Sequence, residues 1–160
     1  MTSATTTRPT EPPTNVFGRT WTLTTTSGHT LTGHLPDWAD TDPSTTGIPL
    51  ERLGAHLADI RHHTAFPGQN VNTVQGSGRP PQDTEILWGH ITCHPYAEDP
   101  DPRIPVVSIA LIDDHWITDL DPEGLTDIAR QLRTQADCLD REIVPRLVAA
   151  RTDWAAHHDD

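Results

Sequence analysis

The sequence predicts an α+β fold in which a small antiparallel sheet carries one long C-terminal helix on a face. Three observations predict it. Apolar and polar residues alternate over residues 20–35, a nearly continuous apolar run covers residues 104–112, and apolar residues recur every three or four positions after Leu125. The first two patterns are typical of strands, and the third is typical of an amphipathic helix.

The first element is a β-hairpin. A loop of three residues, Thr26-Ser27-Gly28, pairs Leu23 with Leu31 and Trp21 with Gly33, and Gly28 suits the left-handed position of such a loop. A two-residue turn would shift the register and split the apolar face, so we reject it. One face of the hairpin should therefore carry Trp21, Leu23, Leu31, Gly33 and Leu35.

A loop rich in Pro, Asp and Ser follows, and Pro49 then opens a predicted helix that runs to His63. Its apolar stripe consists of residues at spacings of three and four: Leu50, Leu53, Leu57 and Ile60. After a flexible loop over residues 75–84, the pattern predicts a three-stranded antiparallel meander with strands at 85–95, 104–112 and 115–119. The middle strand is almost wholly apolar, so it should be central.

The C-terminal helix has the clearest signals in the chain. Asp121 is the predicted N-cap, Pro122 occupies the first turn, and Glu123 complements the helix dipole. Pro145 removes one backbone hydrogen bond, so we expect a kink or break there, after which the helix either folds back or projects. The apolar stripe has an eleven-residue repeat: Leu125, Ile128, Leu132, Ala136, Leu139, Ile143, Leu147, Ala150 and Trp154.

Composition divides the 160 residues into three parts. Residues 1–17 are rich in Thr and Pro and predict a disordered tail, residues 18–144 form the α+β domain, and residues 145–160 are the end of the helix, a possible interface.

No leader or membrane span is recognisable, so we expect a cytoplasmic protein. The net charge of −12 disfavours nucleic-acid binding, which needs a cationic surface. All basic residues are arginine, which indicates a GC-rich bacterial genome.

Residues 88–96, WGHITCHPY, invite a metal-site interpretation. On a strand, however, His90 and His94 lie roughly 13 Å apart and Cys93 points to the opposite face, so they cannot share one ion. Cys93 and Cys138 fit no zinc spacing, and we expect both to be unreactive thiols. No nucleophile elbow, Walker loop or dinucleotide fingerprint is present in the sequence.

A second constellation lies on the predicted helix that begins at Pro49. His56, Asp59 and His63 would fall along one edge of it and could hold zinc if another element supplied a further ligand. The competing interpretation is an ordinary ion pair of Asp59 with His63 on a solvated flank. The sequence alone leaves both open.

The segments Pro95-Tyr96-Ala97-Glu98 and Leu120-Asp121-Pro122, with the helix that follows, resemble a family of small actinobacterial proteins of unknown function. Proteins of that family carry Cys-Pro-x-Trp-Cys near the start. This chain has Leu35-Pro36-Asp37-Trp38-Ala39 there, so any role of the two thiols cannot carry over. The resemblance implies an accessory or regulatory protein and supplies no activity.

These observations favour a non-enzymatic accessory, interaction or regulatory module that binds a protein partner or a second copy of itself, without a cofactor. The predicted interface is the apolar end of the helix: Leu147, Val148, Ala150 and Trp154. These residues could instead fold back onto the domain. One alternative is a metal-binding protein or metallohydrolase that uses zinc at His56, Asp59 and His63. A second alternative is an acidic mimic of nucleic acid.

Overall fold

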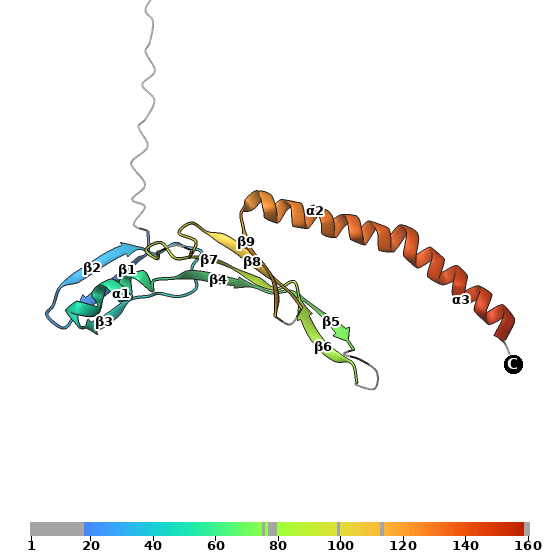
Figure 1. The fold of residues 1–160 in the computed structure, drawn as a ribbon, viewed down its shortest axis with the longest axis horizontal. Coiled ribbons are helices and arrows are strands. Elements are labelled where there is room, and N and C mark those ends of the chain that lie inside the picture. The colour runs from blue at the N-terminus through green and yellow to red at the C-terminus, as the bar shows by residue number, and fades with distance from the viewer. Residues whose placement is uncertain (1–17, 75, 77–79, 99, 113, 159–160) are drawn as a thin grey trace, which may run out of the picture.

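A computed structural model of the chain describes residues 18–74, 76, 80–98, 100–112 and 114–158. The predicted tail over residues 1–17 lies outside the described residues, as do residues 159–160. Figure 1 shows the strands spread along an elongated molecule and a long helix that starts at β9 and ends in a projecting α3. The α+β class is confirmed.

The described elements are β1 (Thr20–Thr25), β2 (Thr30–His34), β3 (Thr45–Ile48), the 3-10 helix η1 (Leu50–Arg52), α1 (Leu53–Ala58), β4 (His62–Phe66), β5 (Gln69–Thr73), β6 (Gln82–Ile86), β7 (Gly89–Cys93), β8 (Val106–Ile112), β9 (His115–Leu120), α2 (Pro122–Cys138), the π-helical turn η2 (Leu139–Ile143) and α3 (Val144–His158). They form a three-stranded sheet β2-β1-β3, a four-stranded sheet β4-β7-β8-β9 and the hairpin β5-β6.

The N-terminal hairpin has the predicted register. Leu23 pairs with Leu31 and Trp21 pairs with Gly33 across β1 and β2. The loop of three residues is closed by a hydrogen bond from the amide of Thr25 to the carbonyl of His29, and Gly28 adopts a φ of 84°. Part of the predicted loop that follows is a strand instead, because β3 adds to β1 in parallel.

Trp21 is the centre of the buried core. Its indole lies against Gly33, and its ring meets Tyr96 edge to face at 5.8 Å between centroids. The other members of this core come from β1, the segment after β2, the end of β3 and the turn after α1: Leu23, Leu35, Ala39, Ile48 and Ile60. Trp38, Leu53 and Leu57 pack against this group and close it toward solvent.

The predicted helix from Pro49 to His63 is wrong in its second half. The chain forms η1 and α1 over Leu50–Ala58 and then turns, and His62–Phe66 becomes the edge strand β4 beside β7. Leu53, Leu57 and Ile60 reach the core, whereas Leu50 is exposed. The apolar stripe therefore belongs to a helical segment of less than three turns. The residues after it, His62–Phe66, form a strand because they pair with β7.

The predicted meander is confirmed in β7, β8 and β9, with the apolar strand β8 in the middle. The strand predicted over residues 85–95 is divided, because Leu87 has a φ of 59° and separates β6 from β7. Such a conformation is strained for a branched side chain and turns the backbone out of the sheet. The hairpin β5-β6, which the sequence analysis did not predict, results from this division.

We predict that Gly33→Ala destabilises the protein by about 1–3 kcal/mol. A Cβ atom at Gly33 would lie 2.1 Å from Cζ2 of Trp21, so the core would have to move. The matched control is Gly54→Ala in α1, where an added Cβ meets nothing within 4 Å and should cost no stability. Urea denaturation measures both changes, and equal stability of Gly33→Ala and wild type would contradict this packing.

Candidate interaction surface

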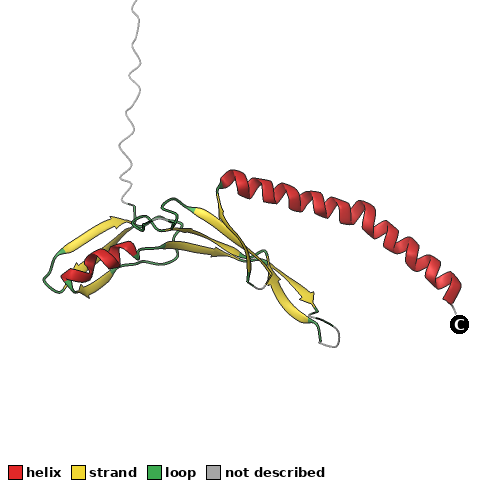
Figure 2. Ribbon diagram, viewed as in Figure 1, coloured by secondary structure: helices red, strands yellow, loops and turns green. Residues whose placement is uncertain are grey.

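The C-terminal helix is the most conspicuous surface of the molecule. Figure 2 shows it as one continuous red ribbon that leaves the yellow strands near its start and extends away from them. Asp121 begins it as predicted, since its carboxylate accepts a hydrogen bond of 2.7 Å from the amide of Gly124, and Pro122 follows in the first turn. The helix thus has a defined start next to β9.

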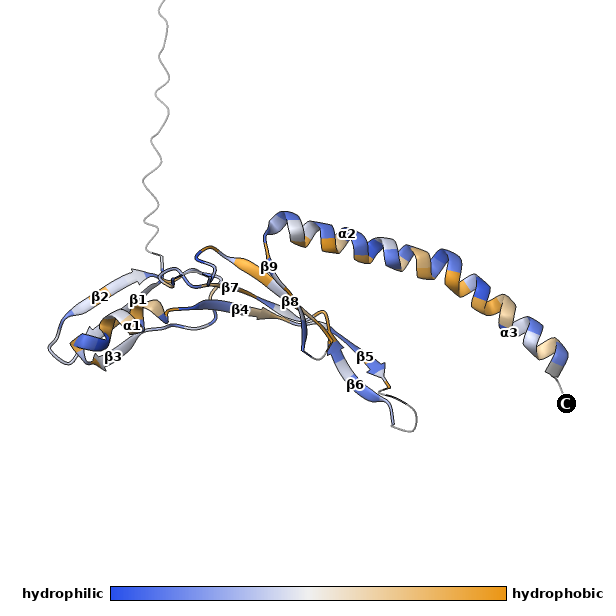
Figure 3. Cartoon of the chain, in the orientation of Figure 1, coloured by the Kyte–Doolittle hydropathy of each residue, from blue (hydrophilic) through white to orange (hydrophobic). Residues whose placement is uncertain are grey.

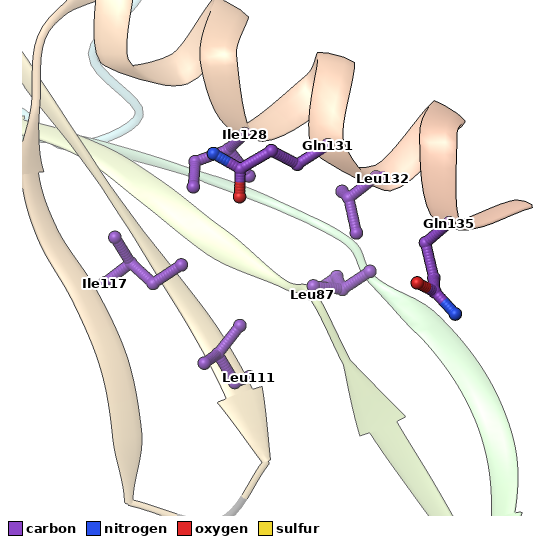
Figure 4. A pocket seen from close by; sticks show the side chains of 7 residues that line it. All are labelled: Leu87, Leu111, Ile117, Ile128, Gln131, Leu132 and Gln135. Atoms are coloured by element: carbon purple, nitrogen blue, oxygen red, sulfur yellow. The ribbon is translucent and has the colours of Figure 1, made fainter.

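Among the described residues, the helix meets the four-stranded sheet where α2 contacts β9. There, a partly open cavity of about 330 Å³ separates α2 from the sheet. Figure 4 shows Leu87, Leu111 and Ile117 on the strand side and Ile128 and Leu132 on the helix side. The predicted packing on the sheet is therefore real but short, and it leaves an apolar hollow unfilled.

Beyond the cavity, the helix exposes large apolar side chains to solvent. Leu147 is 56% exposed, Val148 is 59% exposed and Trp154 is 65% exposed. Leu139 and Ile143, between them and the cavity, are also exposed. Figure 3 shows orange hydrophobic segments recurring along the helix from α2 into α3. A monomeric protein rarely leaves an apolar stripe of this length uncovered, so the stripe is a candidate interface.

The helix does not break at Pro145, and it continues through it to His158. The π-helical turn Leu139–Ile143 lies directly before the proline, with the amide of Val144 bonded to the carbonyl of Leu139 five residues earlier. A wider turn makes room for the proline ring, which would otherwise meet the carbonyl of Arg141. The predicted disturbance is thus a gentle bend, visible in Figure 1, and α3 projects.

All four predicted interface residues lie on the projecting part of the helix. Leu147, Val148, Ala150 and Trp154 are exposed side chains of α3. The alternative in which they fold back onto the domain is not what the structure shows. Their role as an interface stays a prediction.

The three predicted zinc ligands do not share a helix. His56 lies in α1, which ends at Ala58. Asp59 follows that helix, and His63 lies in β4. The helical spacing that suggested the site is therefore absent. Within the described ranges, no group of three or more His, Cys, Asp or Glu side chains could hold a metal ion. The zinc hypothesis stays a prediction without its original geometric support.

A different pair of histidines does come together on the four-stranded sheet. The rings of His63 and His90 lie 5.2 Å apart, and His90 lies 5.5 Å from Trp116, which meets Trp88 edge to face at 4.8 Å. Burial lowers the pKa of His90, and the charges of His63 and Arg61 lower it further. The sequence did not reveal this group of four rings, because His63 was predicted to end a helix instead of lying in β4.

His62, next in the chain to His63, points into the protein. It is buried, its ring meets Trp38 edge to face, and its Nδ1 atom has no hydrogen-bond partner among the described residues. Burial lowers the pKa of His62, with a smaller contribution from His34. Both histidines with lowered pKa values are therefore held in the neutral form by their surroundings.

The thiols behave as small buried or half-buried side chains. Cys93 is buried at the end of β7, and burial raises the pKa of its thiol. Cys138 is partly exposed at the end of α2, and both are free thiols. A raised pKa leaves little thiolate at neutral pH, so Cys93 is a poor nucleophile.

A family described as "Domain of unknown function (DUF6907)" matches residues 21–149, from the first strand into α3. The chain belongs to this family. The DUF6907 match includes Leu147 and Val148, so the helix beyond the π-turn belongs to the family's domain. Comparison with curated proteins and with solved structures gives no match. No helix among the described residues is long and apolar enough to cross a membrane.

Positions 35 and 39, which the resemblance set against two cysteines, are part of the core in this DUF6907 member. Leu35 and Ala39 are both buried, and Trp38 packs against the same group. The amide of Ala39 donates to the carbonyl of Pro36, which closes the turn between them. Apolar packing therefore holds this turn without a thiol chemistry.

We predict that acidification from pH 7.5 to 5.5 lowers the free energy of unfolding. His62 and His90 have lowered pKa values in the folded state, so the unfolded chain binds more protons. Their contribution is complete above the ordinary pKa of 6.5 and is lost as the pH falls from there through the lowered values. Urea titrations at several pH values measure the slope.

The contribution of His90 is isolated by comparing wild type with His90→Gln at each pH. The variant should show a smaller loss of stability on acidification than wild type does. Identical slopes for the two proteins would show that His90 titrates as it does in the unfolded chain.

Proposed function

We propose that this DUF6907 protein is a non-enzymatic interaction module of the bacterial cytoplasm with an accessory or regulatory role. One observation supports it most strongly: the apolar stripe continues along α3, far from any other described element, and remains exposed. Such a surface lowers its free energy when a second protein molecule covers it, by about 25 cal/mol for each Å² of apolar area buried.

The lining of the cavity beside α2 also supports this proposal. The cavity is lined by apolar side chains and two glutamines. An apolar hollow of this kind recognises shape and hydrophobic surface, and it offers no acid, base or nucleophile to a substrate. A docking function would use this apolar surface.

We predict that Leu147→Glu abolishes protein binding by α3, with at least a tenfold loss of recovered partner. The substitution places a charge in the middle of the exposed stripe and leaves the core untouched, because Leu147 is 56% exposed. The matched control is Ala149→Glu, which adds the same charge about 200° around the helix from Leu147.

The measurement is chemical cross-linking of the tagged full-length protein in its native host, followed by mass spectrometry of all recovered chains, its own included. Wild type and Ala149→Glu should recover the same proteins, and Leu147→Glu should lose them. Equal recovery by all three proteins would contradict the proposed function.

A further inference from the structure

The surface of the chain is larger than that of a compact monomer. Its accessible surface is 12788 Å², whereas a compact protein of 17.7 kDa exposes roughly 7,900 Å². All residues outside the described ranges, even if counted as fully exposed, would account for no more than roughly 4,000 Å² of the difference. The remaining excess exceeds the approximately 800 Å² that each partner contributes to a stable interface.

The helix carries two complementary apolar features at its two ends. The first is the cavity between α2 and the sheet, which is lined by Leu87, Leu111, Ile128 and Leu132. The second is the projecting apolar face of α3, represented by Leu147. Leu132 and Leu147 are separated by about 22 Å along one helix, so α3 cannot fold back into the cavity of its own chain.

We propose that the occupant is a second copy of this chain, bound antiparallel along the helix so that each α3 covers the cavity of the other chain. This inference rests on the proposed function and names its partner. The two features are centred near residues 131 and 150, and their midpoint falls in the π-helical turn Leu139–Ile143. A twofold axis at that turn satisfies both cavities at once, as an isologous interface requires.

The spacing of the apolar stripe fits this axis. Reversal of the helix about Arg141 places Ile128 opposite Trp154 and Leu132 opposite Ala150, and it returns Leu139 onto Ile143. The bends of the two helices then coincide, because both lie at the same π-helical turn. Two bent helices pack along their whole length only if they bend at the same place.

The distribution of charge along the helix also favours the antiparallel arrangement. Residues 122–140 hold four acidic side chains and two arginines, whereas residues 141–158 hold three arginines and two acidic side chains. Antiparallel pairing sets the more acidic half against the more basic half. Parallel pairing would set like halves together and would leave both cavities uncovered.

The first test is the mass of the purified full-length protein by light scattering between about 1 and 100 µM, the range in which dimers with interfaces of standard size form. Wild type and Ala149→Glu should have twice the mass of the 17.7 kDa chain, and Leu147→Glu should be monomeric with an unchanged helical circular dichroism spectrum. A monomeric wild type throughout this range would overturn the inference.

The second test determines orientation with a short bismaleimide cross-linker. In a Cys138→Ala background, the double variant Gln131→Cys/Arg151→Cys should cross-link into a dimer, because these positions face each other across the proposed axis. Cys93 is buried and does not compete. Each single variant should remain uncross-linked, and a dimer formed by either single variant would overturn the antiparallel arrangement.

The two proposals fail separately. A monomer that still recovers another protein through Leu147 would overturn self-pairing and leave the interaction function standing. A protein that is monomeric and whose recovered proteins are unaffected by Leu147→Glu would overturn both.

Discussion

The burial of Trp21 is the interaction on which the rest of the fold depends. The indole needs a flat surface, and Gly33 provides it directly across the hairpin, which fixes the register of β1 and β2. Its edge contact with Tyr96 then joins this hairpin to the chain segment that follows β7. Because the four-stranded sheet is joined to the first sheet in this way, the start of α2 has a definite position relative to both.

Short sequence signals predicted the elements whose conformation is determined by residues close together in the chain. Gly28 and the alternating residues determine the hairpin register, the run Val106–Ile112 forms a central strand, and Asp121 with Pro122 defines the start of the helix. The elements that were missed depend on distant partners. His62–Phe66 is a strand because β7 lies beside it, and β5 and β6 contain polar residues whose pairing is mainly through the backbone.

The sequence predicted the apolar stripe of the candidate surface correctly, but it did not predict where the candidate metal ligands lie. Helical periodicity alone identified the stripe through Leu147 and Trp154, since a long helix keeps its period without help from the rest of the fold. The zinc hypothesis relied on a helix that continued from His56 to His63, and one wrong boundary removed that geometric support. The cavity beside Ile128 could not be predicted, because its other wall comes from Leu87, between β6 and β7, and from Leu111 in β8.

A helix held at one end has a consequence for the lifetime of the protein in the cell. The described part of α3 has no core contact to keep it folded, so its end opens more readily than the strands do. Opened segments are where proteases cut, and Arg146 and Arg151 lie within this one. A bound molecule suppresses opening by mass action. Under the proposed pairing, unpaired copies would therefore be trimmed first, and the amount of intact protein would follow the extent of that pairing.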